Sequence, residues 1–183
     1  GRVSYRGYLG SSLDAEGFSG SSGLRGGRQK GSKAKAEDLA LTGRVDVDVA
    51  PGLFVGASFF TGGTGHDQAA PTSGAVIDGN VTLWDLHAGY RHRGFQARVL
   101  WVDVNLDDAA LISDLVGETV GSAMEGFYVE AGYDLLASRM TDQELIPYVR
   151  LERFDTLAQV PGGLEGQSRE TDVLTVGAAY KPI

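Results

Sequence analysis

The stretch Glu144–Thr156, which reads ELIPYVRLERFDT, decides how the rest of the chain is interpreted. Apolar side chains occupy alternate positions of this stretch, at Leu145, Pro147, Val149 and Leu151. Two full charges, Arg150 and Glu152, fall on the opposite face, and this alternation at a period of two indicates a β-strand. In a soluble protein the charged face would meet water, whereas in a transmembrane barrel it would line the lumen.

The composition narrows the class of protein. Of the 183 residues, 42% are hydrophobic and 22% are charged, which excludes both a disordered chain and a helical membrane protein. No run approaches the roughly 18 apolar residues of a spanning helix, but a barrel strand needs only about 9–11 half-polar residues. The net charge of −8 argues against nucleic acid as the main partner, and the absence of cysteine excludes disulfides and thiolate metal sites.

Seven further segments alternate in the same way. They are residues 3–10, 37–49, 53–61, 80–91, 95–104, 127–135 and 171–181. The connections between the eight strands run long, short, long, short, long, short, long, so that all long ones fall on one side of an antiparallel sheet. Outer-membrane barrels have this arrangement, whereas a Greek-key sandwich is not expected to keep it. The pattern predicts an all-β, antiparallel up-and-down transmembrane β-barrel of about eight strands, over residues 1–183 as one domain or the C-terminal part of one.

Two of the long connections contain features of their own. The first, residues 11–36, is rich in Gly and Ser and carries five basic residues, at Arg25, Arg28, Lys30, Lys33 and Lys35. It is interpreted as a long solvated loop; the alternative is an anion-attracting mouth or a contact for phosphorylated lipid headgroups. The third predicts a short helix over residues 109–116, with Asp107 and Asp108 as N-terminal caps and Gly117 at its end.

The polar faces of the strands supply the candidate functional residues. If the apolar faces meet lipid, the pore-lining residues are Arg44, Asp46, Asp85, His87, Arg91, Arg98, Glu130, Arg150 and Glu152, together with Asp48 and Asp134. Opposed basic and acidic groups on a pore wall orient small polar solutes. The alternative is that these charges only pair with one another and keep the lumen wet.

Aromatic residues near the strand ends favour a membrane. On the apolar faces they are Tyr90, Phe95, Tyr133 and Tyr180, accompanied by Trp84 and Trp101. Such residues form belts at the two membrane–water interfaces of transmembrane proteins. In a soluble protein they would be core residues.

Catalytic and cofactor motifs are not found. The three histidines, His66, His87 and His92, are not spaced as metal ligands, and the pair Asp85 and His87 is better explained by coincidence on a polar face than by a catalytic dyad. The TGGTG sequence at residues 61–65 lacks the Lys-Ser/Thr of a phosphate loop, and Asp107, Asp108 and Asp114 do not match a calcium loop. The prediction is a protein that is not an enzyme and has no cofactor or metal site.

Two motifs resemble a known family. Residues 146–156 (IPYVRLERFDT) and 174–182 (LTVGAAYKP) resemble the strands P-[FY]-V-R-x-E-x-[FY]-D-T and T-V-G-x-x-Y-x-P of the phosphate-selective porin family (O/P type) of Gram-negative outer membranes. The resemblance implies the C-terminal half of a sixteen-stranded barrel, in the bacterial outer membrane, that passes small hydrophilic solutes by diffusion, including anions such as phosphate. It also implies membrane lipids and lipopolysaccharide as partners and a homotrimer as the assembly.

The chain departs from that family in two respects. The family builds its anion constriction from basic residues of earlier strands and an inward-folded loop, for which the sequence shows no counterpart. The chain also stops at Ile183 without a terminal aromatic-ended strand, so we expect a partial chain. Two alternatives stay open: an outer-membrane barrel that serves adhesion or docking, and a soluble β-sheet binding protein.

Overall fold

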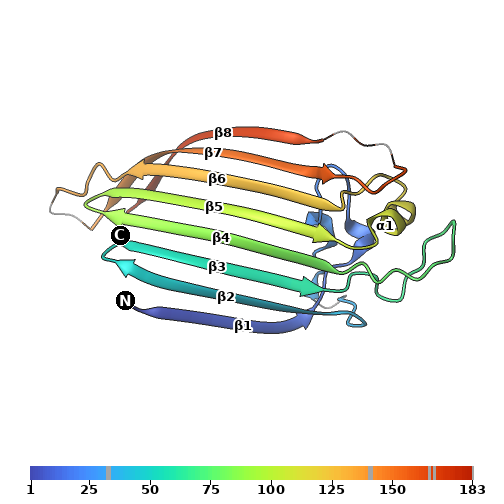
Figure 1. The fold of residues 1–183 in the computed structure, drawn as a ribbon. Coiled ribbons are helices and arrows are strands. Elements are labelled where there is room, and N and C mark those ends of the chain that lie inside the picture. Colours follow the sequence, from blue (N-terminus) through green and yellow to red (C-terminus); the bar gives the residue numbers. More distant parts are fainter. Residues whose placement is uncertain (32–33, 140–141, 165, 167, 183) are drawn as a thin grey trace.

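The computed structural model describes residues 1–31, 34–139, 142–164, 166 and 168–182. Its main feature is one eight-stranded antiparallel sheet in which every strand pairs with its neighbours in the sequence (Figure 1). The strands are β1 (Val3–Ser11), β2 (Leu39–Ala50), β3 (Leu53–Gly62), β4 (Val81–His92), β5 (Phe95–Leu106), β6 (Ala123–Tyr133), β7 (Glu144–Gln159) and β8 (Glu170–Lys181). Two 3₁₀ turns, η1 (Ala15–Gly17) and η2 (Arg25–Gly27), and one helix, α1 (Ala109–Val116), lie in the connections.

The predicted all-β antiparallel order of eight strands is confirmed. The boundaries of β6 differ most from prediction, because it begins at Ala123 rather than at residue 127 and ends at Tyr133 rather than at residue 135. Its early start is explained by the backbone pairing of Ala123 with Asn105 on β5, which extends both strands. Strand β7 likewise continues to Gln159.

The sheet is open. Among the described residues no ladder joins β1 to β8, so the closed barrel predicted from the sequence is not formed by these strands alone. Strands β1 and β8 are edges, and nearly every residue of both is exposed. The long connections all leave the sheet at one end and the short ones at the other, as predicted (Figure 1).

Helix α1 has the predicted bounds but not the predicted cap. Asp108 adopts a left-handed backbone conformation (φ 53°) and its carboxylate makes no cap hydrogen bond to the helix. It accepts instead from the amides of Asp78 and Gly79, at 3.2 and 3.4 Å. Gly117 ends the helix in the left-handed conformation (φ 76°), as expected for a glycine at this position. No helix in the described ranges is long and apolar enough to span a membrane.

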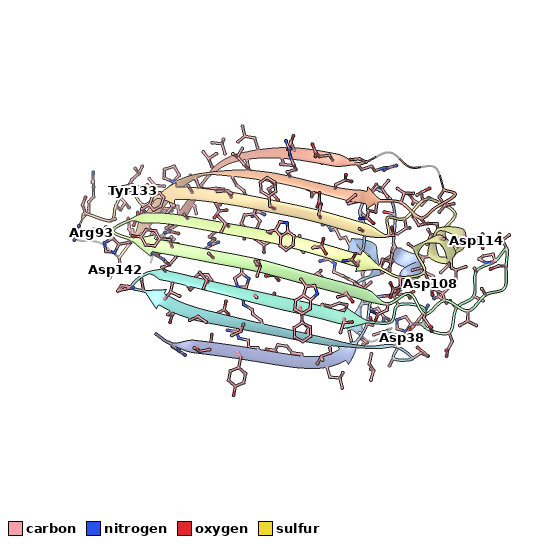
Figure 2. The ribbon with its side chains drawn as sticks, viewed as in Figure 1. Asp38, Arg93, Asp108, Asp114, Tyr133 and Asp142 are labelled. Atoms are coloured by element: carbon pink, nitrogen blue, oxygen red, sulfur yellow. The ribbon has the colours of Figure 1, made fainter. Side chains whose placement is uncertain are left out.

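The hydrophobic core lies at the long-connection end of the sheet, not across its whole width. It joins η1 and α1 to the ends of β4, β5 and β6. Its most buried members are Ala15, Phe18, Ala70, Ile77, Val81, Ile112 and Val120. In Figure 2 the labelled residues Asp38, Asp108 and Asp114 mark this end, and Arg93, Tyr133 and Asp142 mark the end with the short turns.

Candidate functional site

The pairing register separates the two faces of the sheet, because residues directly opposite one another on neighbouring strands share a face. One apolar row runs Val47, Val55, Ala88, Val99, Val129, Leu151 and Leu174 from β2 to β8. The row behind it on the polar face runs Ser4, Asp46, Gly56, His87, Leu100, Tyr128, Glu152 and Val173 from β1 to β8. The middle of the polar face is charged, and we call its charged residues the charged wall: Arg44, Asp46, Asp85, His87, Arg98, Glu130, Arg150 and Glu152.

The first half of the charged wall is a network across β2, β3 and β4 that centres on His87. Arg44 donates two hydrogen bonds of 2.8 Å to the carboxylate of Asp46. His87 lies between two carboxylates, with Nε2 2.8 Å from Asp46 and Nδ1 2.6 Å from Asp85. Ser58 donates to the other oxygen of Asp85. Since both ring nitrogens meet acceptors, the geometry suits an imidazole that donates at both positions.

The second half continues on β5, β6 and β7. Glu130 lies between two guanidinium groups, 3.8 Å from Arg98 and 4.0 Å from Arg150. Arg150 pairs with Glu152 at 2.9 Å and stacks over the ring of Tyr128, 3.9 Å from its centroid. Arg98 is the most exposed of these charges, with 63% of its side chain accessible. It is therefore the cation of this half that is least neutralised by its neighbours.

All nine pore-lining candidates are on the polar face, and each has a partner of opposite charge or a histidine partner. Arg91 is at the short-turn end, where it meets Glu144 at 2.6 Å and so joins β4 to β7. Asp134, which was also expected on the lumen side, lies beyond the end of β6 and caps the turn by accepting from the amides of Leu136 and Leu145, both at 3.0 Å. Asp48 ends the polar register of β2 next to a bulge.

The first long connection, residues 12–38, folds back across the polar face, which was not expected from the sequence. In Figure 1 it passes behind the sheet, from the end of β1 towards the strands at the opposite edge. Thr156 of β7 donates to the carbonyl of Gly20 at 2.7 Å, and the Gly20 amide donates to Glu118 at 3.2 Å. Phe18 is buried in the core. We call this segment the inward connection.

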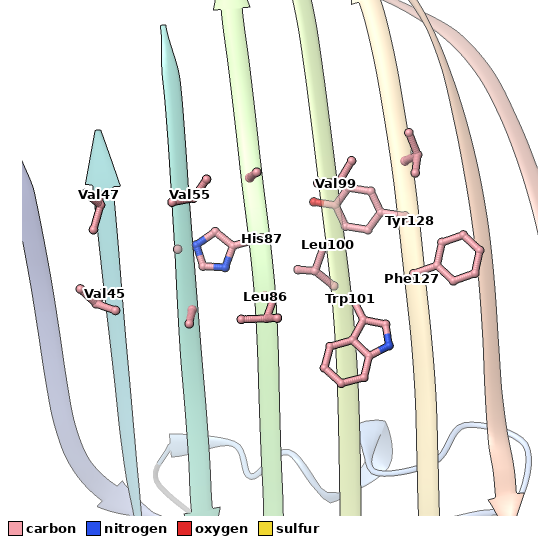
Figure 3. Close-up of a pocket in the computed structure, with 14 residues that line it drawn as sticks. Val45, Val47, Val55, Leu86, His87, Val99, Leu100, Trp101, Phe127 and Tyr128 are labelled. Atoms are coloured by element: carbon pink, nitrogen blue, oxygen red, sulfur yellow. The ribbon is translucent and has the colours of Figure 1, made fainter. Parts of the chain in front are cut away.

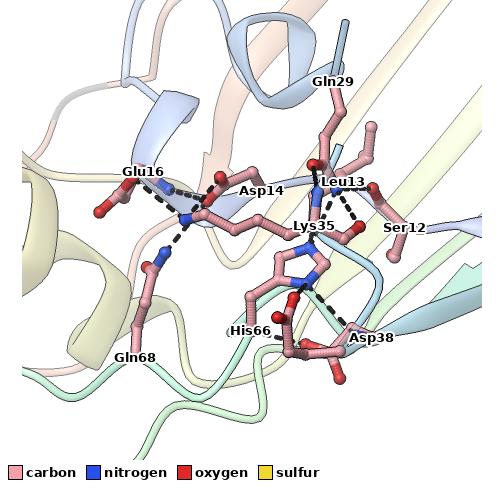
Figure 4. A network of polar contacts seen from close by, with 10 residues as sticks. Ser12, Leu13, Asp14, Glu16, Gln29, Lys35, Asp38, His66 and Gln68 are labelled. Carbon is pink, nitrogen blue, oxygen red and sulfur yellow. Dashed lines mark hydrogen bonds and ion pairs between the residues drawn. The ribbon is translucent and has the colours of Figure 1, made fainter. Parts of the chain in front are cut away.

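The basic residues of the inward connection divide into two groups. Lys35 pairs with Asp14 at 2.9 Å and with Glu16 at 3.3 Å (Figure 4). Arg25, Arg28 and Lys30 have no carboxylate partner in the described part of the chain and border an open groove of about 700 Å³. The remaining predicted member of the group, Lys33, lies outside the described residues.

The Lys35 pair shifts the pKa of both partners. Partial burial of Asp14 on its own raises the pKa of that carboxyl, but the hydrogen bonds from Lys35, the Glu16 amide and Gln68 outweigh it and leave the pKa below its ordinary value. The hydrogen bond to Asp14 raises the pKa of Lys35, and Glu16 adds to this effect. The pair therefore holds η1 against the end of the inward connection over a wide range of pH.

The apolar face carries two rows of aromatic residues. The row nearer the long connections contains Phe59, Trp84, Trp101 and Phe127, and the row nearer the short turns contains Tyr90, Phe95, Tyr133 and Tyr180. On β4, β5 and β6 the two rows are six residues apart (84 and 90, 95 and 101, 127 and 133). Beyond the row nearer the long connections the apolar face becomes charged, at Asp103, Glu125, Arg153 and Asp172.

From β4 to β6 both aromatic rows shift towards the short-turn end of the sheet by the same number of residues. Phe59 opposes Trp84, but Trp101 and Phe127 are in the next apolar row, two residues closer to the short turns. The row nearer the short turns shifts in the same direction, because Tyr90 opposes Ala97 whereas Tyr133 opposes Phe95. The apolar band between the rows is thus a parallelogram of constant height that runs obliquely to the strands.

A shallow apolar hollow of about 680 Å³ lies in this band (Figure 3). Ala57 and Ala88 leave space between larger neighbours such as Leu86, Trp101 and Phe127. Its lining is almost entirely apolar, so the hollow suits a hydrocarbon chain rather than a polar solute.

Sequence reasoning missed the residues that hold the inward connection. Within β5 the polar register carries Gln96 and Arg98 and then turns apolar, at Leu100, Val102, Val104 and Leu106. A strand that is apolar on both faces over half of its length indicates that something covers both faces. That signal was present in the sequence, but it does not identify which connection supplies the cover.

No protein-family model matches the chain. A protein of Aquifex aeolicus (strain VF5), described as an uncharacterized protein, is 31% identical over 192 aligned residues, which cover 98% of this chain. The alignment covers 43% of that protein, so the chain spans less than half of the length of this relative.

Proposed function

We propose that these strands are part of a transmembrane β-barrel of the outer-membrane porin type, which passes small hydrophilic solutes by diffusion. The observation that carries the proposal is the pair of aromatic rows that flank an exposed apolar band. A soluble β-sheet has no reason to keep two aromatic rows at a fixed spacing on a face that meets water. Aromatic girdles at both ends of an apolar band are typical of outer-membrane barrels.

The slope of the aromatic rows relative to the strands supports a sheet that crosses a bilayer. The rows shift by two residues over two strands, which is one residue per strand. With about 3.3 Å per residue and 4.8 Å between strands, this slope corresponds to strands tilted by roughly 35° from the normal to the rows. Strands of transmembrane barrels are tilted by about 35–45° from the membrane normal. The apolar hollow is then a place for a lipid acyl chain.

The charged wall supports a water-filled interior. Most of its charges follow the same slope. Asp46 and His87 are two residues nearer the long connections than the row of Arg98, Glu130 and Arg150, and Arg44 and Asp85 are four residues nearer. Basic and acidic groups therefore occupy one depth of the proposed pore, where they impose a transverse field on a passing solute. The inward connection narrows the mouth. Arg25, Arg28 and Lys30, which have no carboxylate partner among the described residues, favour the approach of anions such as phosphate.

The open edges define what the barrel still needs. The backbone groups of β1 and β8 cannot face hydrocarbon unpaired, so further strands must close the barrel. A sixteen-stranded barrel in the outer membrane, assembled as a trimer and in contact with lipopolysaccharide, is the form that the family resemblance favours. Conductance distinguishes a channel from an adhesion or docking barrel, because only a channel carries current.

The test is a planar-bilayer recording of the reconstituted protein. We expect an ohmic current. We expect the double substitution Arg98→Glu and Arg150→Glu to shift the reversal potential towards cation selectivity, because it makes the net charge of the charged wall more negative by four elementary charges. Arg153→Glu is the matched control, since Arg153 is on the apolar side of the same strand as Arg150. It should leave the reversal potential unchanged.

Two results would overturn the proposal. A folded monomer in plain buffer without detergent would favour the soluble binding protein. A protein that inserts into membranes but carries no ion current would favour the adhesion or docking barrel.

A further inference from the structure

His66 joins the two ends of the inward connection, although it belongs to the next long connection, residues 63–80 (Figure 4). Its side chain is fully buried. The ring Nε2 is 3.0 Å from the carbonyl oxygen of Leu13, and the amide of Asp38 donates to Nδ1 at 3.2 Å. The backbone of His66 adds a third bond, from its amide to the Asp38 carboxylate at 2.7 Å. Leu13 and Asp38 are the places where the connection leaves β1 and enters β2.

These partners fix the protonation of the ring. An amide N–H only donates, so Nδ1 must accept, and a carbonyl oxygen only accepts, so Nε2 must carry the proton. The docked geometry therefore requires a neutral imidazole. Gln29, whose side-chain nitrogen is 3.2 Å from Nε2, directs its own hydrogens to the carbonyls of Ser12 and Lys35.

The charged groups around His66 decide what a second proton would do. Glu37 is the carboxylate nearest to Nδ1, at 3.7 Å. The carboxylate of Asp38 is engaged by the His66 amide, and Lys35, behind Gln29, is paired with Asp14 and Glu16. The neighbouring carboxylate on its own connection, that of Asp67, is exposed. A proton on Nδ1 would therefore oppose the Asp38 N–H and find its acceptor in Glu37.

We propose that His66 is a positioning residue that acts as a pH-sensitive latch on the inward connection. The neutral ring holds both ends of the connection against the sheet. Proton uptake at Nδ1 turns the ring towards Glu37, breaks the bonds to Asp38 and Leu13, and releases the connection from the polar face. A wider mouth in acid follows only if the proposed channel function is correct, whereas the latch itself does not depend on it.

Hydrogen exchange of backbone amides in detergent micelles tests the latch directly. For the wild-type protein we expect the amides of residues 13–29 to exchange at least about tenfold faster at pH 5.5 than at pH 7.5, after correction for intrinsic rates. His66→Gln keeps a donor for Leu13 but does not titrate, so its exchange should be the same at both pH values. His92→Gln, at the exposed C-terminal end of β4, is the matched control and should behave as the wild type.

The outcomes separate the latch from its alternatives. A wild-type protein whose exchange does not change between the two pH values overturns the latch, as does a wild-type response in His66→Gln. If residues 13–29 of His66→Gln exchange fast at both pH values, Glu37→Gln is the deciding variant. The latch requires a smaller difference in exchange between the two pH values once the Glu37 carboxylate can no longer accept the Nδ1 proton. A difference equal to that of the wild type overturns the latch. A pH-dependent exchange in a protein that carries no current would reject the channel and retain the latch.

Discussion

Strand β5 (Phe95–Leu106) crosses two regions whose polar faces are built differently. Near the short turns that face carries Gln96 and Arg98, and Arg98 is part of the charged wall. Near the long connections the same face carries Val104 and Leu106, both buried in the core under η1 and α1. The apolar face of the strand stays exposed over most of its length.

This difference teaches where the stability of the sheet comes from. At the long-connection end a conventional core holds three connections together, whereas in the charged wall the side chains hold one another through ion pairs and hydrogen bonds. The exposed apolar face contributes nothing to the stability of the sheet until lipid or detergent covers it. The two regions should therefore respond differently to substitution and to solvent.

The largest effect is expected in the core. Ile112→Ala on α1 removes a side chain that is fully buried, and the lost packing should destabilise the docked connections by about 2–5 kcal/mol. Hydrogen exchange of residues 109–120 measures the loss, and the ladders between β2 and β7 should stay protected. Leu86→Ala on the apolar face, where the side chain is 57% exposed, should change stability by less than about 1 kcal/mol in detergent. Equal losses for both variants would contradict the division into two regions.

A second pair of variants separates the two faces of one strand. Val176 is on the apolar face of β8 and Val173 is on the polar face, where it opposes Glu152. In lipid vesicles Val176→Arg should cost about 2–4 kcal/mol of folding free energy, because it places a charge in hydrocarbon, whereas Val173→Arg should fold as the wild type. Urea titration of the vesicle-inserted protein measures both. If the two variants are equally stable, the apolar face does not meet lipid.

The regular part of the fold was predictable from the sequence because each strand carries its own signal. Alternation at a period of two located all eight strands and the two faces of the sheet, and turn chemistry at Gly52 and Gly94 located two of the short connections. Both glycines have positive φ, 78° and 85°. Helix α1 was predictable for the same reason, since its apolar stripe and Gly117 are local features.

The candidate site was predictable only in part, because its contacts join distant segments. The charged wall followed from alternation, but the bridge from Asp46 to His87 depends on the register of three strands. The inward connection was interpreted as a solvated loop because its composition is that of one. Nothing local in residues 12–38 reveals that Phe18 enters the core or that His66 holds Leu13.

The smallest effect concerns the ion pair that ties η1 to the end of the inward connection. Because the pKa of Asp14 is lowered by folding, its contribution is present above the unfolded value and is lost as the pH falls through the lower folded value. Lys35 has a raised pKa, so its contribution is lost only as the pH rises through that folded value. For a partly exposed pair the stabilisation is about 0.5–1 kcal/mol after solvent screening.

Asp14→Asn should therefore weaken docking of residues 13–29 slightly at neutral pH and remove the additional loss that the wild type shows below about pH 4. Hydrogen exchange in the His66→Gln background measures this loss without the proposed latch. Asp114→Asn is the matched control, because hydrogen bonds from the Thr72 side chain and amide also lower the pKa of Asp114, but on a different connection. An acid response of residues 13–29 that disappears in Asp114→Asn and persists in Asp14→Asn would place the acid-sensitive contact in α1 and not in the inward connection.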